Sequence, residues 1–144
     1  SACRSVKKQT LKIDSRTDQL VTVREFISRA AYAFGFNDED VSKIALAVDE
    51  ACTNVIKHAY HYNSNKKITI TVQGRNGDFE VIIADTGRKF DPSKIQLPNM
   101  KEYLSKYKRG GLGVYLMKSL MDRVEYDIEP GKRNRVRLVK HLPR

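Results

Sequence analysis

The sequence predicts an α+β fold in which helices and a sheet form a two-layer sandwich. Two runs, 68–72 and 79–83, alternate apolar and polar side chains, and Asn76-Gly77 between them is a strong hairpin signal. Two longer segments nearer the N-terminus instead repeat apolar side chains at helical spacing. The predicted order is β-α-α-β-β-lid-α-β-β. Because strands fall in adjacent hairpins and do not alternate with helices, a doubly wound parallel sheet is not indicated.

The N-terminal part of the chain predicts an edge strand followed by a helix. Residues 6–13 have strand character but carry three lysines, which are typical of an edge strand because they discourage pairing with another chain. A helix is expected to begin within 14–17, and apolar residues then recur at helical spacing as far as Phe34. Gly35 is the expected C-cap of that helix.

A second helix is expected to begin at Asn37 and to end in the polar stretch 61–66. Three acidic residues follow Asn37 and suit the positive end of the helix dipole. Cys52 is expected to be a buried free thiol, because two cysteines this far apart give no metal spacing and no disulfide framework, which fits a reducing cytoplasm. The predicted apolar stripe consists of Val41, Ile44, Ala45, Val48, Cys52, Val55 and Ala59.

The second half of the chain combines a long loop with a helix and two strands. Residues 88–109 contain two prolines and seven Lys or Arg against two acids, and loops this long in a compact domain are usually lids, binding loops or disordered. A helix is expected over about 112–121, with strands over 123–128 and 134–141. Its expected apolar positions, four residues apart, are Leu112, Leu116 and Leu120.

Length and composition indicate one domain over residues 1–144 and a polyanionic partner. The formal charge is +10, from 27 Lys and Arg against 17 Asp and Glu, which suggests nucleotide phosphate, nucleic acid or an acidic protein without choosing among them. A basic surface without a specific partner stays open. No stretch approaches the roughly 18 apolar residues of a membrane span. The chain begins without Met or a signal peptide, so we expect a processed start or a longer parent chain.

Three motifs carry candidate chemistry. Glu50 and Asn54 are four residues apart and share one helix face, with Glu50 about 200° around the axis from Val48. Asp85-Thr86-Gly87 follows a strand, where a carboxylate can enter a pocket and Gly allows close approach of a ligand. Gly110-Gly111-Leu112-Gly113 precedes a helix, whose N-terminal N–H groups attract anions. Each has an ordinary structural alternative: a solvated helix face, an Asx turn and a loop hinge.

Together the three motifs resemble, in order and spacing, those of the GHKL (Bergerat-fold) ATPases, and most closely the small anti-sigma factors of the RsbW type. The resemblance spans about residues 10–141. It implies a Bergerat fold with a mixed, mostly antiparallel sheet and an ATP lid. The supporting strings are 48–54 with 58–60, 85–87 with 90–92, and 110–113 through 120–122, followed by Val124-Glu125-Tyr126.

The resemblance assigns a role to each motif. Asn54 would bind Mg²⁺ bridging the nucleotide phosphates, and Glu50 would be the general base for a serine hydroxyl. Asp85 would accept from the adenine amino group of ATP, with Gly87 allowing close approach. The phosphate end of the lid would be framed by Gly110, Gly111, Leu112 and Gly113, with Arg109 added from its position and charge.

The function implied by the resemblance is that of an ATP-dependent protein serine/threonine kinase in the cytoplasm. Such a protein sequesters a sigma factor, phosphorylates a serine of a STAS-domain antagonist, switches between these partners and commonly forms a homodimer. One departure stands out: Arg133-Asn134-Arg135 occupies the place where the family often has Gly-Thr.

Two other functions stay open beside the kinase. The departure favours a nucleotide-dependent binding regulator without phosphotransfer, whereas the presence of Glu50 argues against it. A nucleic-acid binder is suggested by charge alone, since no helix-turn-helix, zinc finger or aromatic stacking motif accompanies the charge. Neither direct nucleic-acid binding nor membrane binding is expected.

Overall fold

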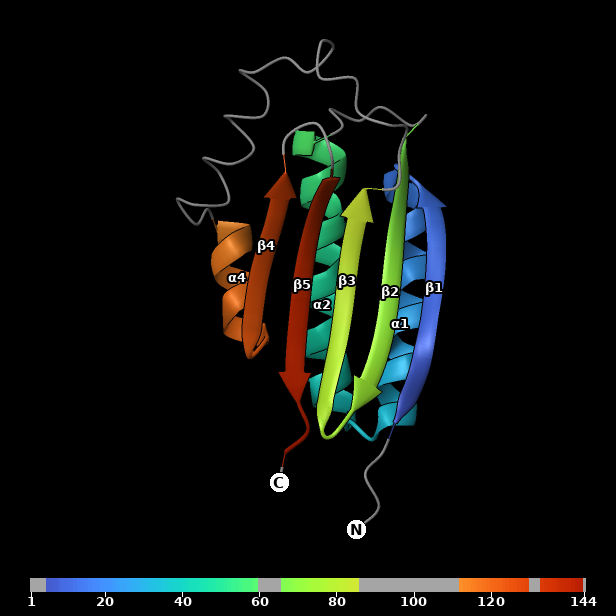
Figure 1. Ribbon diagram of the computed structural model, residues 1–144, viewed down its shortest axis with the longest axis vertical. Coiled ribbons are helices and arrows are strands. Elements are labelled where there is room, and N and C mark those ends of the chain that lie inside the picture. The colour runs from blue at the N-terminus through green and yellow to red at the C-terminus, as the bar shows by residue number, and fades with distance from the viewer. Residues whose placement is uncertain (1–4, 60–65, 86–111, 130–132, 144) are drawn as a thin grey trace.

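The computed structural model describes residues 5–59, 66–85, 112–129 and 133–143. The described helices and strands follow one another in the predicted order (Figure 1). The elements are β1 (Val6–Asp14), a 3-10 turn (Thr17–Gln19), α1 (Leu20–Phe34), α2 (Asp38–Asn54), a π-helical turn (Val55–Ala59), β2 (Lys67–Arg75), β3 (Asp78–Asp85), α4 (Leu112–Leu120), β4 (Arg123–Glu129) and β5 (Arg133–His141). The expected lid over 88–109 lies outside the described residues.

The strands form one five-stranded sheet in the order β1-β2-β3-β5-β4. All four pairings of the described strands are antiparallel, where a mixed, mostly antiparallel sheet was expected. Helices α1, α2 and α4 lie on one face of the sheet, with α2 in the middle and in contact with both others (Figure 1). The two-layer α+β sandwich is therefore confirmed, and β1 is an edge strand as predicted.

The β2–β3 hairpin forms where the sequence predicted it. Asn76 and Gly77 both have positive φ, 55° and 82°, which matches the right-handed twist of the flanking strands. The register then places Ile70 opposite Ile83 and Val72 opposite Val81. All four side chains are buried under the helices, so the turn and the apolar alternation specify the same register.

Both predicted helix caps are present. Gly35 has φ 114°, and its N–H donates to the carbonyl oxygens of Ala31 and Tyr32, which ends α1. The side chain of Asn37 accepts from the backbone N–H of Asp40 at 2.8 Å, which begins α2. These short-range signals fix where α1 ends and where α2 begins.

The buried face of α2 is broader than the predicted stripe. Ala45 is only partly buried, whereas Ala47, Ala51 and Ile56 are buried in addition. The reason is that α2 packs against the sheet and against helices on both sides. The regular helix also ends at Asn54, and the chain continues to Ala59 as a π-helical turn.

The apolar face of α4 also differs from the expected leucine positions. Met117 and Met121 are 0% and 5% exposed, whereas Leu116 and Leu120 are only partly buried. The predicted boundaries of α4, β4 and β5 agree with the structure to within one residue. No helix among the described residues is long and apolar enough to cross a membrane.

Candidate active site

Three elements that are distant in sequence meet at one end of the sandwich. Helix α2 finishes at Asn54, β3 finishes at Asp85 and α4 begins at Leu112, and all three of these ends lie at the upper end of Figure 1. The described parts of the three sequence motifs, which end or begin at Asn54, Asp85 and Leu112, therefore lie toward one end of the fold. This placement depends on the topology, in which α2 and β3 run toward that end and α4 runs away from it.

Glu50 lies near the solvent side of α2, turned away from α1. Asp49 marks the opposite side, because its carboxylate accepts a hydrogen bond from Arg24 of α1 at 3.4 Å. Leu46 marks the solvent side, since it is 46% exposed and about 200° around the axis from the buried Val48. By the same geometry, Leu46 lies between Asp49 and Glu50 in angle. Glu50 therefore points away from α1, and Asn54, one turn later, follows it.

Both side chains are available to a ligand. Glu50 and Asn54 are half-buried, and neither has a hydrogen-bond or ion-pair partner within the described part of the chain. Amide and carboxylate oxygens are suitable ligands for Mg²⁺. The described residues contain no group of three or more His, Cys, Asp or Glu that could hold a metal ion. Mg²⁺ usually retains several waters and binds through few protein ligands plus phosphates, so Asn54 fits the ion as one ligand of a nucleotide complex.

A π-helical turn follows the candidate metal ligand directly. Residues Val55–Ala59 form this turn, and Val55 and Ile56 within it are 5% and 0% exposed. Single π turns inside helices occur frequently at functional sites because the extra residue redirects the chain. Sequence reasoning missed this turn, and the local pattern contains no signal that distinguishes it from a continuing α-helix.

Asp85 ends the strand whose apolar side chains support the helices. It follows Phe79, Val81 and Ile83 in the two-residue alternation, and all three of those side chains are buried. It pairs in register with Ile68 of β2. The end of β3 thus lies toward the same end of the fold as Asn54. Gly87 lies outside the described residues.

The first turn of α4 supplies the third part of the site. Leu112 and Gly113 belong to this turn, where backbone N–H groups are not yet paired within the helix. Such N–H groups and the helix dipole favour a phosphate. Arg109, Gly110 and Gly111 lie outside the described residues.

Cys52 lies on the buried side of α2 and takes no part in the site. Its thiol is fully buried, and burial, with the nearby Asp49 charge, raises its pKa from 9.0 to about 12. A thiol that remains protonated is a poor nucleophile. The predicted structural role of Cys52 is confirmed.

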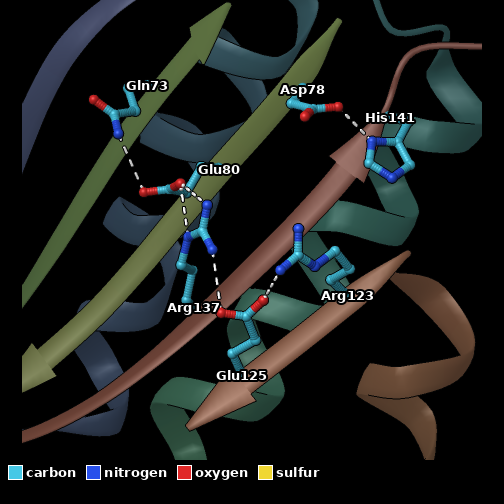
Figure 2. Close-up of polar contacts among 7 residues, drawn as sticks. All are labelled: Gln73, Asp78, Glu80, Arg123, Glu125, Arg137 and His141. Atoms are coloured by element: carbon cyan, nitrogen blue, oxygen red, sulfur yellow. Dashed lines mark hydrogen bonds and ion pairs between the residues drawn. The ribbon is translucent and has the colours of Figure 1, made fainter. Parts of the chain in front are cut away.

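The open face of the sheet carries a separate network of ion pairs (Figure 2). Arg137 of β5 donates to Glu80 of β3 at 2.7 Å and to Glu125 of β4 at 3.1 Å. Gln73 donates to the other carboxylate oxygen of Glu80, and Arg123 pairs with Glu125. The hydrogen bond to Glu80 raises the pKa of Arg137. Burial raises the pKa of Glu125, but hydrogen bonds from Arg137 and Arg123 outweigh it and lower that pKa overall. These charges hold strands together.

At 133–135 this chain has Arg-Asn-Arg where the family often has Gly-Thr, and an ion pair on the open face of the sheet partly explains this difference. Arg135 donates to Asp127 of β4 at 2.5 Å, on the side of the sheet away from the helices. Arg135 is therefore engaged by β4, and its charge is already paired within the sheet.

Comparisons with known proteins point to one family. A sequence model of the histidine kinase-like ATPase domain matches residues 13–140. The serine-protein kinase RsbW of Bacillus subtilis strain 168 is 31% identical over 126 residues, covering 84% of this chain and 78% of the relative. The enzyme of the same name from Bacillus velezensis is 32% identical over 132 residues, covering 88% and 82%.

Solved structures agree on the fold. The RsbU and RsbW domains of a Mycobacterium tuberculosis protein superpose with a TM-score of 0.68 at 17% identity, over 96% of this chain and 33% of that longer chain. A chain of the SiaB–SiaC complex from Pseudomonas aeruginosa gives a TM-score of 0.60 at 10% identity, over 93% of this chain and 89% of that chain. At these identities the similarity concerns the fold.

Proposed function

The chain belongs to the histidine kinase-like ATPase family, and we propose that it is an ATP-dependent protein serine kinase that acts as an anti-sigma regulatory factor. The observation that carries this proposal is the pair Glu50 and Asn54, half-buried near the end of α2 and without a hydrogen-bond or ion-pair partner among the described residues. The RsbW relatives, which are named serine-protein kinases, support the same activity.

In this proposal, ATP is bound by residues at or next to the end of α2, the end of β3 and the start of α4. Asp85 accepts a hydrogen bond from the adenine amino group, and Gly87 allows the base to approach the backbone. The phosphates lie against the N-terminal turn of α4, where the N–H groups of 110–113 and the side chain of Arg109 donate to them. The +10 charge of the chain favours this anionic ligand.

Asn54 and Glu50 have different roles in phosphoryl transfer. The side-chain oxygen of Asn54 would hold Mg²⁺, an ion that would neutralise phosphate charge. Glu50, one helical turn earlier, accepts the proton of a serine hydroxyl as the oxygen approaches the γ-phosphate. Phosphoryl transfer depends mainly on positioning and charge neutralisation, which a carboxylate and an amide on one rigid helix face provide.

The partners in this proposal are a STAS-domain antagonist and a sigma factor. Phosphorylation of the antagonist serine switches the kinase between these two proteins, and the kinase acts as a homodimer in the cytoplasm. The resemblance described above and the RsbW relatives support this assignment.

A nucleotide-dependent regulator without phosphotransfer is the second candidate function. The ion pair between Arg135 and Asp127 favours it, because it leaves the replaced Gly-Thr position without a compensating cation from Arg135. Both candidates bind ATP, so only transfer distinguishes them.

Glu50→Gln tests the kinase against this alternative. The variant should bind ATP as the wild type does, and it should transfer phosphate to the antagonist about 10²- to 10⁴-fold more slowly because the general base is gone. The assay follows labelled phosphate from ATP to each purified STAS-domain protein of the source organism. Glu25→Gln, at an exposed position of α1, is the matched control and should match the wild type. Equal transfer rates for Glu50→Gln and the wild type would contradict the proposal.

A further inference from the structure

The helix layer exposes large apolar side chains that the fold does not use. Among the described residues, four large hydrophobic side chains are strongly exposed, and all lie on helices: Val21 (52%), Tyr32 (49%), Leu46 (46%) and Tyr115 (69%). The hydroxyl of Tyr32 donates to Asp38 at 2.6 Å and so links α1 to α2. The other three have no such contact, and exposed apolar groups that gather on one surface commonly mark an interaction site.

Leu46 and Tyr115 lie on two helices that are in contact, and both point to solvent. Leu46 is one turn before Glu50 on the solvent side of α2. Tyr115 is on α4, about 200° around that helix from the buried Met117, so it too points to solvent. Helices α2 and α4 are in contact. Val21, in contrast, is on α1, the helix that Asp49 faces through its ion pair with Arg24.

Exposed lysines are also present on α4 and in the turn that follows α2. Lys118 of α4 and Lys57 of the π-helical turn are exposed and have no ion-pair partner among the described residues. Lys43, lower on α2, differs because it pairs with Glu39 at 3.5 Å. A protein that covers Leu46 and Tyr115 therefore gains from acidic side chains at the edge of the contact.

We infer that Leu46 and Tyr115 form the docking surface for the protein that presents the serine, which contacts them through an apolar side chain flanked by acidic residues. This inference rests on the proposed kinase activity. A substrate serine has to reach Glu50, so the bound protein must cover the neighbouring solvent side of α2. A second copy of this chain in the same place would block that approach.

The test compares Leu46→Ser and Tyr115→Ala, alone and together, with Val21→Ser. The probe is whichever purified STAS-domain protein the wild type phosphorylates. Exposed aromatic and aliphatic anchors typically contribute about 1–2 kcal/mol each, so each variant should raise the KM for that protein about 5- to 30-fold. The kcat and the affinity for ATP should be unchanged. Val21→Ser is the matched control, because Val21 is equally exposed but lies on α1.

Charge reversal gives a second, independent measurement. Lys118→Glu should raise the KM for the STAS-domain protein at low salt, and the effect should shrink as ionic strength rises. The reversal Arg29→Glu, at an exposed position of α1, should have no such effect.

The outcomes distinguish a failure of the proposed kinase activity from a failure of the docking surface alone. If the wild type phosphorylates none of the STAS-domain proteins, the proposed function fails and the docking surface fails with it. If the wild type is active but Leu46→Ser and Tyr115→Ala keep its KM, only the docking surface is wrong. If these variants lose self-association in sedimentation velocity with an unchanged KM, the surface is instead an interface between two copies of this chain.

Discussion

Charged side chains on the open face of the sheet are paired with one another, whereas two polar side chains at the upper end of the helix layer have no partner among the described residues. On the open face, Arg137 joins Glu80 and Glu125 across three strands (Figure 2). At the end of α2, Glu50 and Asn54 have no partner within the described residues. A fold of this size can pair its charges, as the open face demonstrates. We therefore propose that Glu50 and Asn54 are completed by a ligand and not by the protein itself.

The two aspartates of β3, replaced one at a time, should show the largest difference in ATP affinity. Asp85→Ala removes the proposed adenine acceptor and should weaken ATP binding about 10- to 100-fold, the value of one charged hydrogen bond. Asp78→Ala, at the other end of the same strand, removes only the ion pair with His141 and should leave ATP affinity unchanged. Calorimetric titration of both variants measures this difference. Equal losses would show that neither aspartate contacts the base.

The dependence of stability on pH should reveal the burial of Cys52, which lies on the buried side of α2. The pKa of Cys52 is raised in the folded state to about 12, so its contribution is complete below pH 9 and is lost as pH rises from 9 toward 12. At pH 10 the wild type should lose about 1 kcal/mol of its free energy of unfolding through this group. Urea denaturation at pH 7 and pH 10 should show this loss in the wild type but not in Cys52→Ala. An identical pH dependence in both proteins would contradict burial of the thiol.

The ion-pair network should matter for stability alone. Arg137→Met leaves Glu80, whose side chain is 14% exposed, without its cation. Because Arg137 itself is 38% exposed, we expect a loss of only about 1 kcal/mol in the free energy of unfolding. Urea denaturation measures the loss, and calorimetry should find ATP binding unchanged. A loss of ATP affinity would mean that the two faces are coupled.

Short-range signals allowed much of the fold to be predicted. Asn76-Gly77 gave the hairpin, Gly35 and Asn37 gave the helix ends, and the side of α2 that carries Glu50 followed from helical periodicity. These features depend on neighbours within a few residues, which a single sequence displays directly.

The features that sequence reasoning missed depend on the assembled molecule. The ion pairs of Arg137 require the order β3-β5-β4, which no local pattern contains. The burial of Ala47 and Ala51 requires that α2 lie between two other helices. The turn at 55–59 requires a change in hydrogen-bond pattern inside a sequence that still reads as a helix.

The most direct test of the central claim is the effect of Mg²⁺ on ATP binding to the wild type and to Asn54→Ala. Asn37→Ala, which loses only the cap of α2, serves as the control. Calorimetric titrations of ATP with and without Mg²⁺ should show a clear gain in affinity from Mg²⁺ for the wild type and for Asn37→Ala, and no gain for Asn54→Ala. The same gain in all three proteins would contradict the assignment of Asn54, and no ATP binding by the wild type would contradict the site itself.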